Sequence, residues 1–439
     1  MRPAGSSFSP LDGKLELTAE GYSPAVVRKL VRQGSKAAGF ADACDDLKEL
    51  AQVTVSPKHL ERLTERVGKE WAAARDADVA AFRAGRLGRD YPQPPGPGVV
   101  AAVMLDGGRA QTRADGQGPG VHEPGWKETK VACCLTLESG QSDTDPQPRP
   151  PAKFLDPPAV AKLVRQIKAR GQCKDGGEGG AARQDKAKGK AKAKRRKKGR
   201  RGGAKDRGKR LVRTAVATMA DSEAFGWQVM AEVHRRGLDR AGQGRKACVC
   251  DGQHYNWSIF AMHLEPAGFT GVLDVLHLLT YLYAAAGAAA GRGTIKAWEL
   301  YERWLRGAWA GKAAQVLTEL TEAAARLGPP PGGADEQDPR RVAAEAVTYV
   351  ANNLGRMDYP RYRKLGLPTS SAPVESLIKQ FNRRVKGSEK FWLKDGAEAV
   401  LQVRAAYLSE DGRAERYWDR RRPHQRAAGH GTLPRRKVA

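Results

Sequence analysis

The sequence lacks any run of about 18 apolar residues, the length a membrane-spanning helix requires. Its first residues also lack the apolar core of a secretory signal peptide. We therefore expect a soluble cytoplasmic chain, associated with the nucleoid if its partner is DNA, and we expect no membrane partner.

Cysteine is scarce, and its spacing matches no known metal or redox motif. The six cysteines include no CxxC pair and do not have the spacing of zinc ligands. They are Cys44, Cys133, Cys134, Cys173, Cys248 and Cys250. We expect reduced thiols, partly buried in strands.

Negative charge is also in short supply. The chain has 76 Lys and Arg against 49 Asp and Glu, a formal net charge of +27. The segment 174–210 holds 17 basic and 4 acidic residues, so about half of the excess lies elsewhere. A basic excess spread over the chain indicates a polyanionic partner, with nucleic acid as the default.

At 439 residues the chain is long enough for two or three domains. Residues 1–90 read as a helical N-terminal domain, in which the turn 53–55 joins two helices. Ser56 caps the second helix and Pro57 occupies its first position. Its inner stripe comprises Leu60, Leu63 and Val67, and its outer basic face includes Lys58, Arg62 and Arg66. We favour a DNA-reading helix-turn-helix over a hairpin used for packing or dimerisation.

A Pro/Gly linker at 91–98 precedes a β-rich region, 99–173. A buried strand is expected to end at Asp106, with Gly107 and Gly108 in a turn before a second strand. Residues 125–138 form a third strand of an antiparallel meander, and 159–170 form a helix. The Lys/Arg/Gly-rich segment 174–210 has too few apolar residues for a core and reads as a flexible tether. We favour a solvated insertion without a specific role, and the alternative is a segment that raises non-specific DNA affinity.

The core resumes at 211–269 with a helix at 222–237 and a short apolar strand before Asp251. Asp106 and Asp251 thus share one local setting, because each follows a buried strand and precedes Gly. A carboxylate at the end of a buried strand is costly unless it is paired or binds a metal. The alternative for each aspartate is a simple turn residue, since Asp-Gly is common in hairpins.

A third carboxylate, Glu375, begins the helix predicted after Ser370 and Ser371. At 100° per residue, this helix places Glu375 on one face with a set of basic and amide side chains; they are Lys379, Asn382 and Lys386, with Arg383 at the edge. An ordinary charged face, with Glu375 and Lys379 as an i,i+4 pair, is the alternative. Convergence of Glu375 with Asp106 and Asp251 would give an oxygen-only ligand set for two divalent ions, with Mg²⁺ preferred and Mn²⁺ as the alternative.

Residues 270–354 are expected to form a helical insertion. Asp274 and His277 lie on one helical face there, and we favour an internal hydrogen bond over a contact with flanking DNA. We assign the tryptophans of this block to the core rather than to base stacking; they are Trp298, Trp304 and Trp309.

Several of these stretches resemble bacterial insertion-sequence DDE transposases, most closely the ISKra-type group. The matching stretches are LDGGRAQTR, GWKETKVA, VCDGQHYNWSI, LDVLHLLTYLYAAA, MDYPRYRKLGLP, VESLIKQFNRRVKGSEKFW and GAEAVLQVRAAYLS. They cover 98–145 and 211–420 well and 20–110 loosely. The long basic segment 174–210 and the basic tail 423–439 depart from the group's pattern.

This resemblance implies a mixed α/β fold with an RNase H-like catalytic core, interrupted by the helical insertion and completed by 355–422. It implies Asp106, Asp251 and Glu375 as the catalytic metal-binding triad, with Asp274 and His277 similar to an auxiliary (C/D)xxH element. It further implies cleavage and strand transfer at transposon ends, with terminal repeats and target DNA as partners of a homo-oligomer. A DNA-binding regulator derived from a transposase, and an RNase H-like nuclease that cuts without joining, remain as alternatives.

Overall fold

The computed structural model describes residues 21–90, 98–172 and 208–421, together with 17 and 96, apart from positions 115, 119, 121, 124, 243 and 388. These residues form a mixed α/β fold around one five-stranded sheet. None of their helices has the length and apolar character needed to cross a membrane. The expectations for most of the linker 91–98, for nearly all of 174–210 and for the tail 423–439 concern residues outside this part.

The sheet has the strand order β3-β2-β1-β4-β5. β1 pairs antiparallel with β2, which pairs antiparallel with β3, whereas β4 and β5 run parallel to β1. Strand bounds are β1 (Val99–Thr112), β2 (Gly125–Glu138), β3 (Lys209–Thr218), β4 (Lys246–Cys250) and β5 (Thr270–Leu273). An antiparallel meander is present, but its strands differ from those predicted: the expected first and second strands are the single strand β1, the expected third strand is β2, and β3, which sequence reasoning missed, completes the meander.

The prediction that the first strand ends at Asp106 is wrong. β1 continues through Gly107 and Gly108 to Thr112 and stays paired with β2 throughout. A Cβ on Gly107 would lie 2.9 Å from the Tyr255 hydroxyl, and one on Gly108 would lie 2.9 Å from Thr129 Oγ1. The two glycines therefore allow close packing on both faces of an extended strand, rather than forming a turn.

The helical insertion was predicted to begin too early. Residues 270–273 form the edge strand β5, and the helix that follows begins at Val275 with Asp274 as its N-cap. Two tyrosine hydroxyls cover carbonyl groups of this edge, since Tyr359 donates to Leu273 O at 3.1 Å and Tyr362 to Gly271 O at 3.2 Å. Such bonds satisfy backbone groups that an edge strand otherwise exposes for pairing.

The N-terminal helices are α2 (Pro24–Lys36), α3 (Phe40–Ala51) and α4 (Pro57–Arg83). Ser56 caps α4 by accepting from the His59 amide at 3.3 Å, and Leu60, Leu63 and Val67 are buried, as predicted. α4 continues to Arg83, and it packs on α14 and on α6. At Gly68 a Cβ would lie 2.2 Å from the Ala399 carbonyl oxygen, so only glycine permits this approach.

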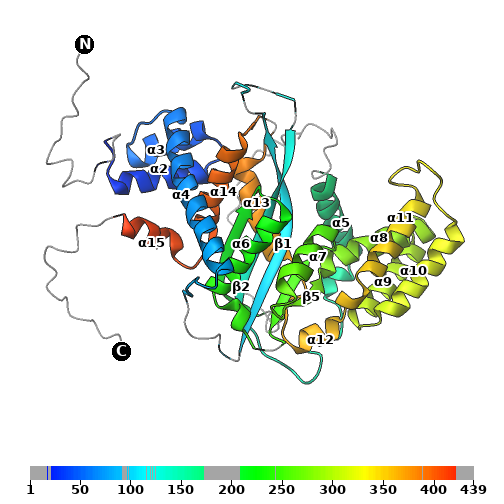
Figure 1. Cartoon of the computed structure of the whole chain (residues 1–439). Coiled ribbons are helices and arrows are strands. Elements are labelled where there is room, and N and C mark those ends of the chain that lie inside the picture. Colours follow the sequence, from blue (N-terminus) through cyan, green and yellow to red (C-terminus); the bar gives the residue numbers. More distant parts are fainter. Residues whose placement is uncertain are drawn as a thin grey trace, which may run out of the picture.

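The remaining α-helices lie on both sides of the sheet (Figure 1). They are α5 (Pro157–Gln172), α6 (Ser222–Arg235), α7 (His254–Ile259), α8 (Val275–Ala290), α9 (Ile295–Trp309), α10 (Ala313–Leu327), α11 (Pro339–Asn352), α12 (Tyr359–Lys364), α13 (Ala372–Val385), α14 (Lys394–Leu408) and α15 (Arg413–Arg420). Short 3-10 turns are η1 (Ala152–Phe154), η2 (Leu238–Arg240) and η4 (Leu354–Arg356), and η3 (Phe260–Leu264) is a π-helical continuation of α7. Figure 1 shows α2–α4 on one side of the sheet and α8–α11 on the other.

Two hydrophobic clusters hold this arrangement together. The larger one joins the sheet, α13 and the helical block α8–α11, and it includes Trp304 and Trp309, which are buried as predicted. The smaller one joins α2–α4 to Val403 of α14 and Trp418 of α15. The cysteines among the described residues are free thiols, and four of the five are buried in β2 and β4, as predicted.

One buried cation links the N-terminal helices to α13. Arg384 is 1% exposed, donates from Nε to Gly34 O at 2.8 Å and stacks on Phe40 of α3 at 4.2 Å. Burial lowers the pKa of this guanidinium to about 10. α13 itself packs against β1 and β2, and α14 packs against β3.

Candidate functional site

Three aspartates form a row across neighbouring parallel strands. Met104 of β1 pairs with Val249 of β4, so two residues further along the same register places Asp106 beside Asp251. Cys250 pairs with Leu273 of β5, so the next position places Asp251 beside Asp274. Residues at matched positions of parallel strands point to the same face. Strand register therefore puts three carboxylates in one line, Asp106 within the longer β1 and Asp251 and Asp274 directly after β4 and β5.

These carboxylates are almost removed from solvent. Asp106, Asp251 and Asp274 are 8%, 6% and 0% exposed. Burying ionised carboxylates without compensation is strongly unfavourable, so their partners determine what the site can do.

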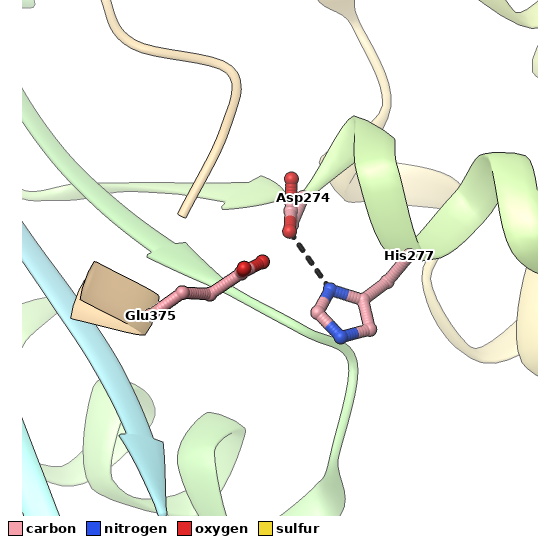
Figure 2. A group of neighbouring side chains, drawn as sticks. All are labelled: Asp274, His277 and Glu375. Carbon is pink, nitrogen blue, oxygen red and sulfur yellow. Dashed lines mark hydrogen bonds and ion pairs between the residues drawn. The ribbon is translucent and has the colours of Figure 1, made fainter. Parts of the chain in front are cut away.

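Glu375 approaches this row from the first turn of α13. The helix starts at Ala372, directly after Ser370 and Ser371 as predicted, and Pro373 lies in its first turn. Asn382 and Ile378, further along α13, lie 3.0 and 3.7 Å from the Cβ position of Gly108, on the face of β1 that also carries Asp106. Figure 2 shows the Glu375 side chain extending from α13 toward Asp274 and His277.

Asp274 anchors the start of α8 and the approach to α13. Its Oδ1 accepts from the Leu276 amide at 3.0 Å, which caps the helix. Its Oδ2 accepts from Ser371 Oγ at 2.6 Å and is 2.8 Å from His277 Nδ1. The predicted Asp274–His277 hydrogen bond is present, drawn as a dashed line in Figure 2. Both oxygens are thus engaged by the protein, which favours an anchoring role for Asp274.

Asp106 and Asp251 are held by short-range hydrogen bonds. Asp106 Oδ1 accepts from the Gly107 amide at 2.7 Å. Asp251 Oδ1 accepts from the Gln253 amide at 3.1 Å and from Asn256 Nδ2 at 3.0 Å. Asn256 is fully buried on α7 and fixes the orientation of the Asp251 carboxylate.

The buried carboxylates shift the pKa values of two neighbouring side chains, His277 and Tyr255. Burial lowers the pKa of His277, but the hydrogen bond and charge of Asp274, together with the charges of Asp251 and Asp106, raise it overall to about 9. Burial raises the pKa of Tyr255 far above its usual value, and the charges of Asp251, Asp106 and Glu128 raise it further. Asp106 and Asp251 therefore act electrostatically on the same two groups.

The residues present suit a divalent cation. Ligand atoms of Asp274, His277 and Glu375 all lie within 4.8 Å of one another, and within the described ranges this is the only cluster of three or more such groups. Asp106 and Asp251 stand outside that cluster but beside Asp274 in the row. Carboxylate oxygens favour Mg²⁺ or Mn²⁺, and the imidazole is a better ligand for Mn²⁺ or Zn²⁺ than for Mg²⁺. The site thus offers acidic ligands for a divalent cation.

The predicted DNA-contact residues fall on two helices. Lys379 and Arg383 of α13 are exposed, Asn382 is partly buried, and Lys386 lies 5.7 Å from the Trp126 ring of β2. On α4 the outer residues Lys58, Arg62 and Arg66 are exposed.

Sequence reasoning missed several residues of this site. Ser371 was noted only as a helix start, and Asn256, Tyr255 and Tyr349 were not selected. Their roles depend on neighbours distant in sequence, as with Ser371 Oγ and Asp274, which are 97 residues apart. The run Phe269–Leu273 before Asp274 was the one available signal, because it repeats the pattern of an apolar strand ending in Asp.

Comparison of the chain with protein families, with curated proteins and with solved structures finds no match.

Proposed function

We propose that this protein is a DDE-type transposase that cleaves DNA and joins strands at the ends of an insertion sequence, using Mg²⁺ or Mn²⁺. The observation that carries this proposal is the row of buried carboxylates on β1 and directly after β4 and β5, which Glu375 approaches from a helix with a basic exposed face. An RNase H-like core belongs to the same proposal, supported by the mixed five-stranded sheet and by the position of the acidic residues on it.

Asp106, Asp251 and Glu375 would hold the metal ions. Asp274 is the weakest candidate ligand of the four, because a helix cap, His277 and Ser371 already engage its oxygens. When bound, a pair of divalent ions would activate the attacking oxygen and stabilise the leaving oxygen of an in-line displacement.

The protein's own residues would position the DNA around these carboxylates. Lys379, Arg383 and Lys386 would contact phosphates and set the register of the strand, which contributes position rather than sequence. His277, hydrogen-bonded through Nδ1 to Asp274, would keep that carboxylate in place beside the metal-binding residues. The outer face of α4 would read the terminal repeats in the major groove.

The reaction has two balanced steps. Water attacks the phosphodiester at an element end, which releases a 3′-hydroxyl and leaves a 5′-phosphate on the other fragment. The 3′-hydroxyl then attacks a target phosphodiester, so one bond forms as another breaks. Two ends must be held together for this, so we propose a homo-oligomer on DNA.

The test uses a supercoiled plasmid that carries the element's own flanking ends, with Mg²⁺ and purified protein. Wild-type protein should nick and join, whereas Asp106→Asn, Asp251→Asn and Glu375→Gln should each lower the rate at least 100-fold while still binding DNA. Glu345→Gln, at an exposed carboxylate on α11, is the matched control and should retain wild-type activity.

Each other outcome would favour a different function for this protein. Tight binding without cleavage by the wild type would favour a DNA-binding regulator. Cutting without joining would favour a nuclease. A triad variant that still cleaves would remove its residue from the metal site.

A further inference from the structure

The turn that carries Asp251 is covered by a residue from the helical block. Tyr349 lies near the end of α11, 98 residues away in the sequence, and its hydroxyl donates to the Asp251 carbonyl oxygen at 2.8 Å. Burial raises the pKa of Tyr349 well above its usual value, so the hydroxyl keeps its proton and acts as a donor. This bond holds the main chain of Asp251, whereas Asn256 holds its side chain.

The tyrosine ring also fixes the shape of the turn. Gly252 has φ +94°, a conformation that favours glycine. A Cβ at this position would lie only 2.5 Å from Tyr349 Cε2, so the ring packs directly on the glycine backbone. The turn after β4 is therefore shaped to receive this ring.

Tyr349 is in turn held by α8. Its ring stacks on Tyr281 with centroids 3.7 Å apart and an interplanar angle of 12°. Tyr281 follows His277 by one helical turn, on the same face of α8. The stacked pair thus connects the helix that presents Asp274 and His277 with the turn that presents Asp251.

We propose that Tyr349 is a positioning residue: through its hydrogen bond to the Asp251 carbonyl, it sets the location of the Asp251 carboxylate relative to Asp106 and Glu375. This inference rests on the proposed function, since it assumes that Asp251 is a metal ligand. Under this proposal the helical block α8–α11 orients a residue of the site, because α11 contributes Tyr349.

The consequence concerns metal affinity. A ligand whose backbone is free to shift must be ordered when the ion binds, and that cost weakens binding. Loss of one hydrogen bond of ordinary strength, about 1 kcal/mol, corresponds to about a fivefold change in a binding constant.

The test compares two substitutions that each remove one hydroxyl from the stacked pair. Tyr349→Phe keeps the ring on Gly252 and loses the bond to Asp251. Tyr281→Phe keeps the same stack, and its hydroxyl makes no hydrogen bond with the described residues. For full-length protein, free Mn²⁺ is measured by electron paramagnetic resonance during titration, and plasmid cleavage is measured against Mn²⁺ concentration.

We expect Tyr349→Phe to raise the Mn²⁺ dissociation constant and the half-maximal Mn²⁺ concentration for cleavage about fivefold, with near wild-type cleavage at saturating Mn²⁺. Tyr281→Phe should match the wild type in both. Unchanged Mn²⁺ affinity in Tyr349→Phe, or equal shifts in the two variants, would overturn the inference.

The two readouts separate this inference from the function on which it rests. A wild type that binds Mn²⁺ but leaves DNA intact would overturn the proposed function, and the titration would still decide the role of Tyr349. A wild type that binds no Mn²⁺ would overturn both.

Discussion

At the residue scale, two glycines determine how closely neighbouring groups approach the strand that carries Asp106. Gly107 and Gly108 follow Asp106 within β1, where the absence of a side chain allows Tyr255 on one face and α13 on the other to approach the strand. The site geometry thus depends on two residues that contribute no functional group.

We predict that Gly108→Ala will lower both stability and cleavage. The added Cβ would lie 2.9 Å from Thr129 Oγ1 and 3.0 Å from Asn382 Oδ1, so both side chains must move, which disturbs the packing of α13 against β1 near Glu375. Overpacking of this kind costs about 1–3 kcal/mol. Urea unfolding and plasmid cleavage would measure the two effects.

Gly98→Ala provides the matched control. Gly98 directly precedes β1 and has no heavy atom within 4 Å of its Cβ position, so the substitution should leave stability and cleavage unchanged. If Gly108→Ala were as stable and as active in cleavage as Gly98→Ala, the packing of α13 against β1 would tolerate a side chain at position 108.

A buried ion cluster joins separate helices at the element scale. Glu232 of α6 accepts from Arg413 of α15 at 2.6 Å and from Arg235 at 2.8 Å. Arg413 also lies 2.8 Å from Asp411. Burial raises the pKa of Glu232, but the charges and hydrogen bonds of Arg413 and Arg235 dominate and hold it far below its usual value. The cluster therefore fastens α15 to α6.

We predict that this cluster makes the protein sensitive to acid. A carboxylate whose folded pKa is depressed contributes stability above its unfolded pKa of about 4.3, and loses it as pH falls toward the folded value. Wild-type unfolding free energy should therefore fall between pH 5 and pH 2. Glu232→Gln should cost about 3–5 kcal/mol at pH 7, because it breaks a buried pair, and should make this fall shallower.

Urea unfolding at a series of pH values measures both effects. Glu345→Gln removes an exposed carboxylate that pairs with Arg341 and should change neither the stability nor its pH dependence by more than about 0.5 kcal/mol. An unchanged acid limb in Glu232→Gln would contradict the assigned role of Glu232.

Charge acts at the scale of the whole molecule. The chain carries a formal net charge of +27, and 15 of its Lys and Arg lie between 174 and 207. Basic residues that contact DNA release counterions from the phosphates, so binding weakens as salt rises.

We predict that replacing these 15 residues by Gln will weaken non-specific DNA binding and flatten its salt dependence, with a smaller effect on cleavage. Each lost phosphate contact should lower the slope of log K against log salt by about 0.9. Fluorescence anisotropy with random duplex DNA at several salt concentrations measures the slope.

The opposite change is the control for this experiment. Replacing the four Asp and Glu of the same segment by Asn and Gln should strengthen binding and steepen the slope. Loss of cleavage with intact DNA binding in the Gln variant would show that the segment acts in the chemistry itself.

Local sequence pattern alone was sufficient to predict several helix starts, one strand and much of the burial in this protein. The apolar run before Asp251, the helix start at Ser56 and Pro57 and the helix start after Ser370 and Ser371 each depend on neighbours a few residues away, and the structure has all three. The burial of the strands and of Trp304 and Trp309 likewise follows from composition and periodicity.

Long-range pairing decided the rest. Whether Gly107 and Gly108 turn or extend depends on the side chains of Tyr255, Thr129 and Asn382 that surround them, not on the Asp-Gly sequence itself. β5 is too short to be distinguished from a helix start until Cys250 pairs with Leu273. The row of Asp106, Asp251 and Asp274 exists only because strand register aligns residues far apart in sequence, and register is a property of the folded sheet.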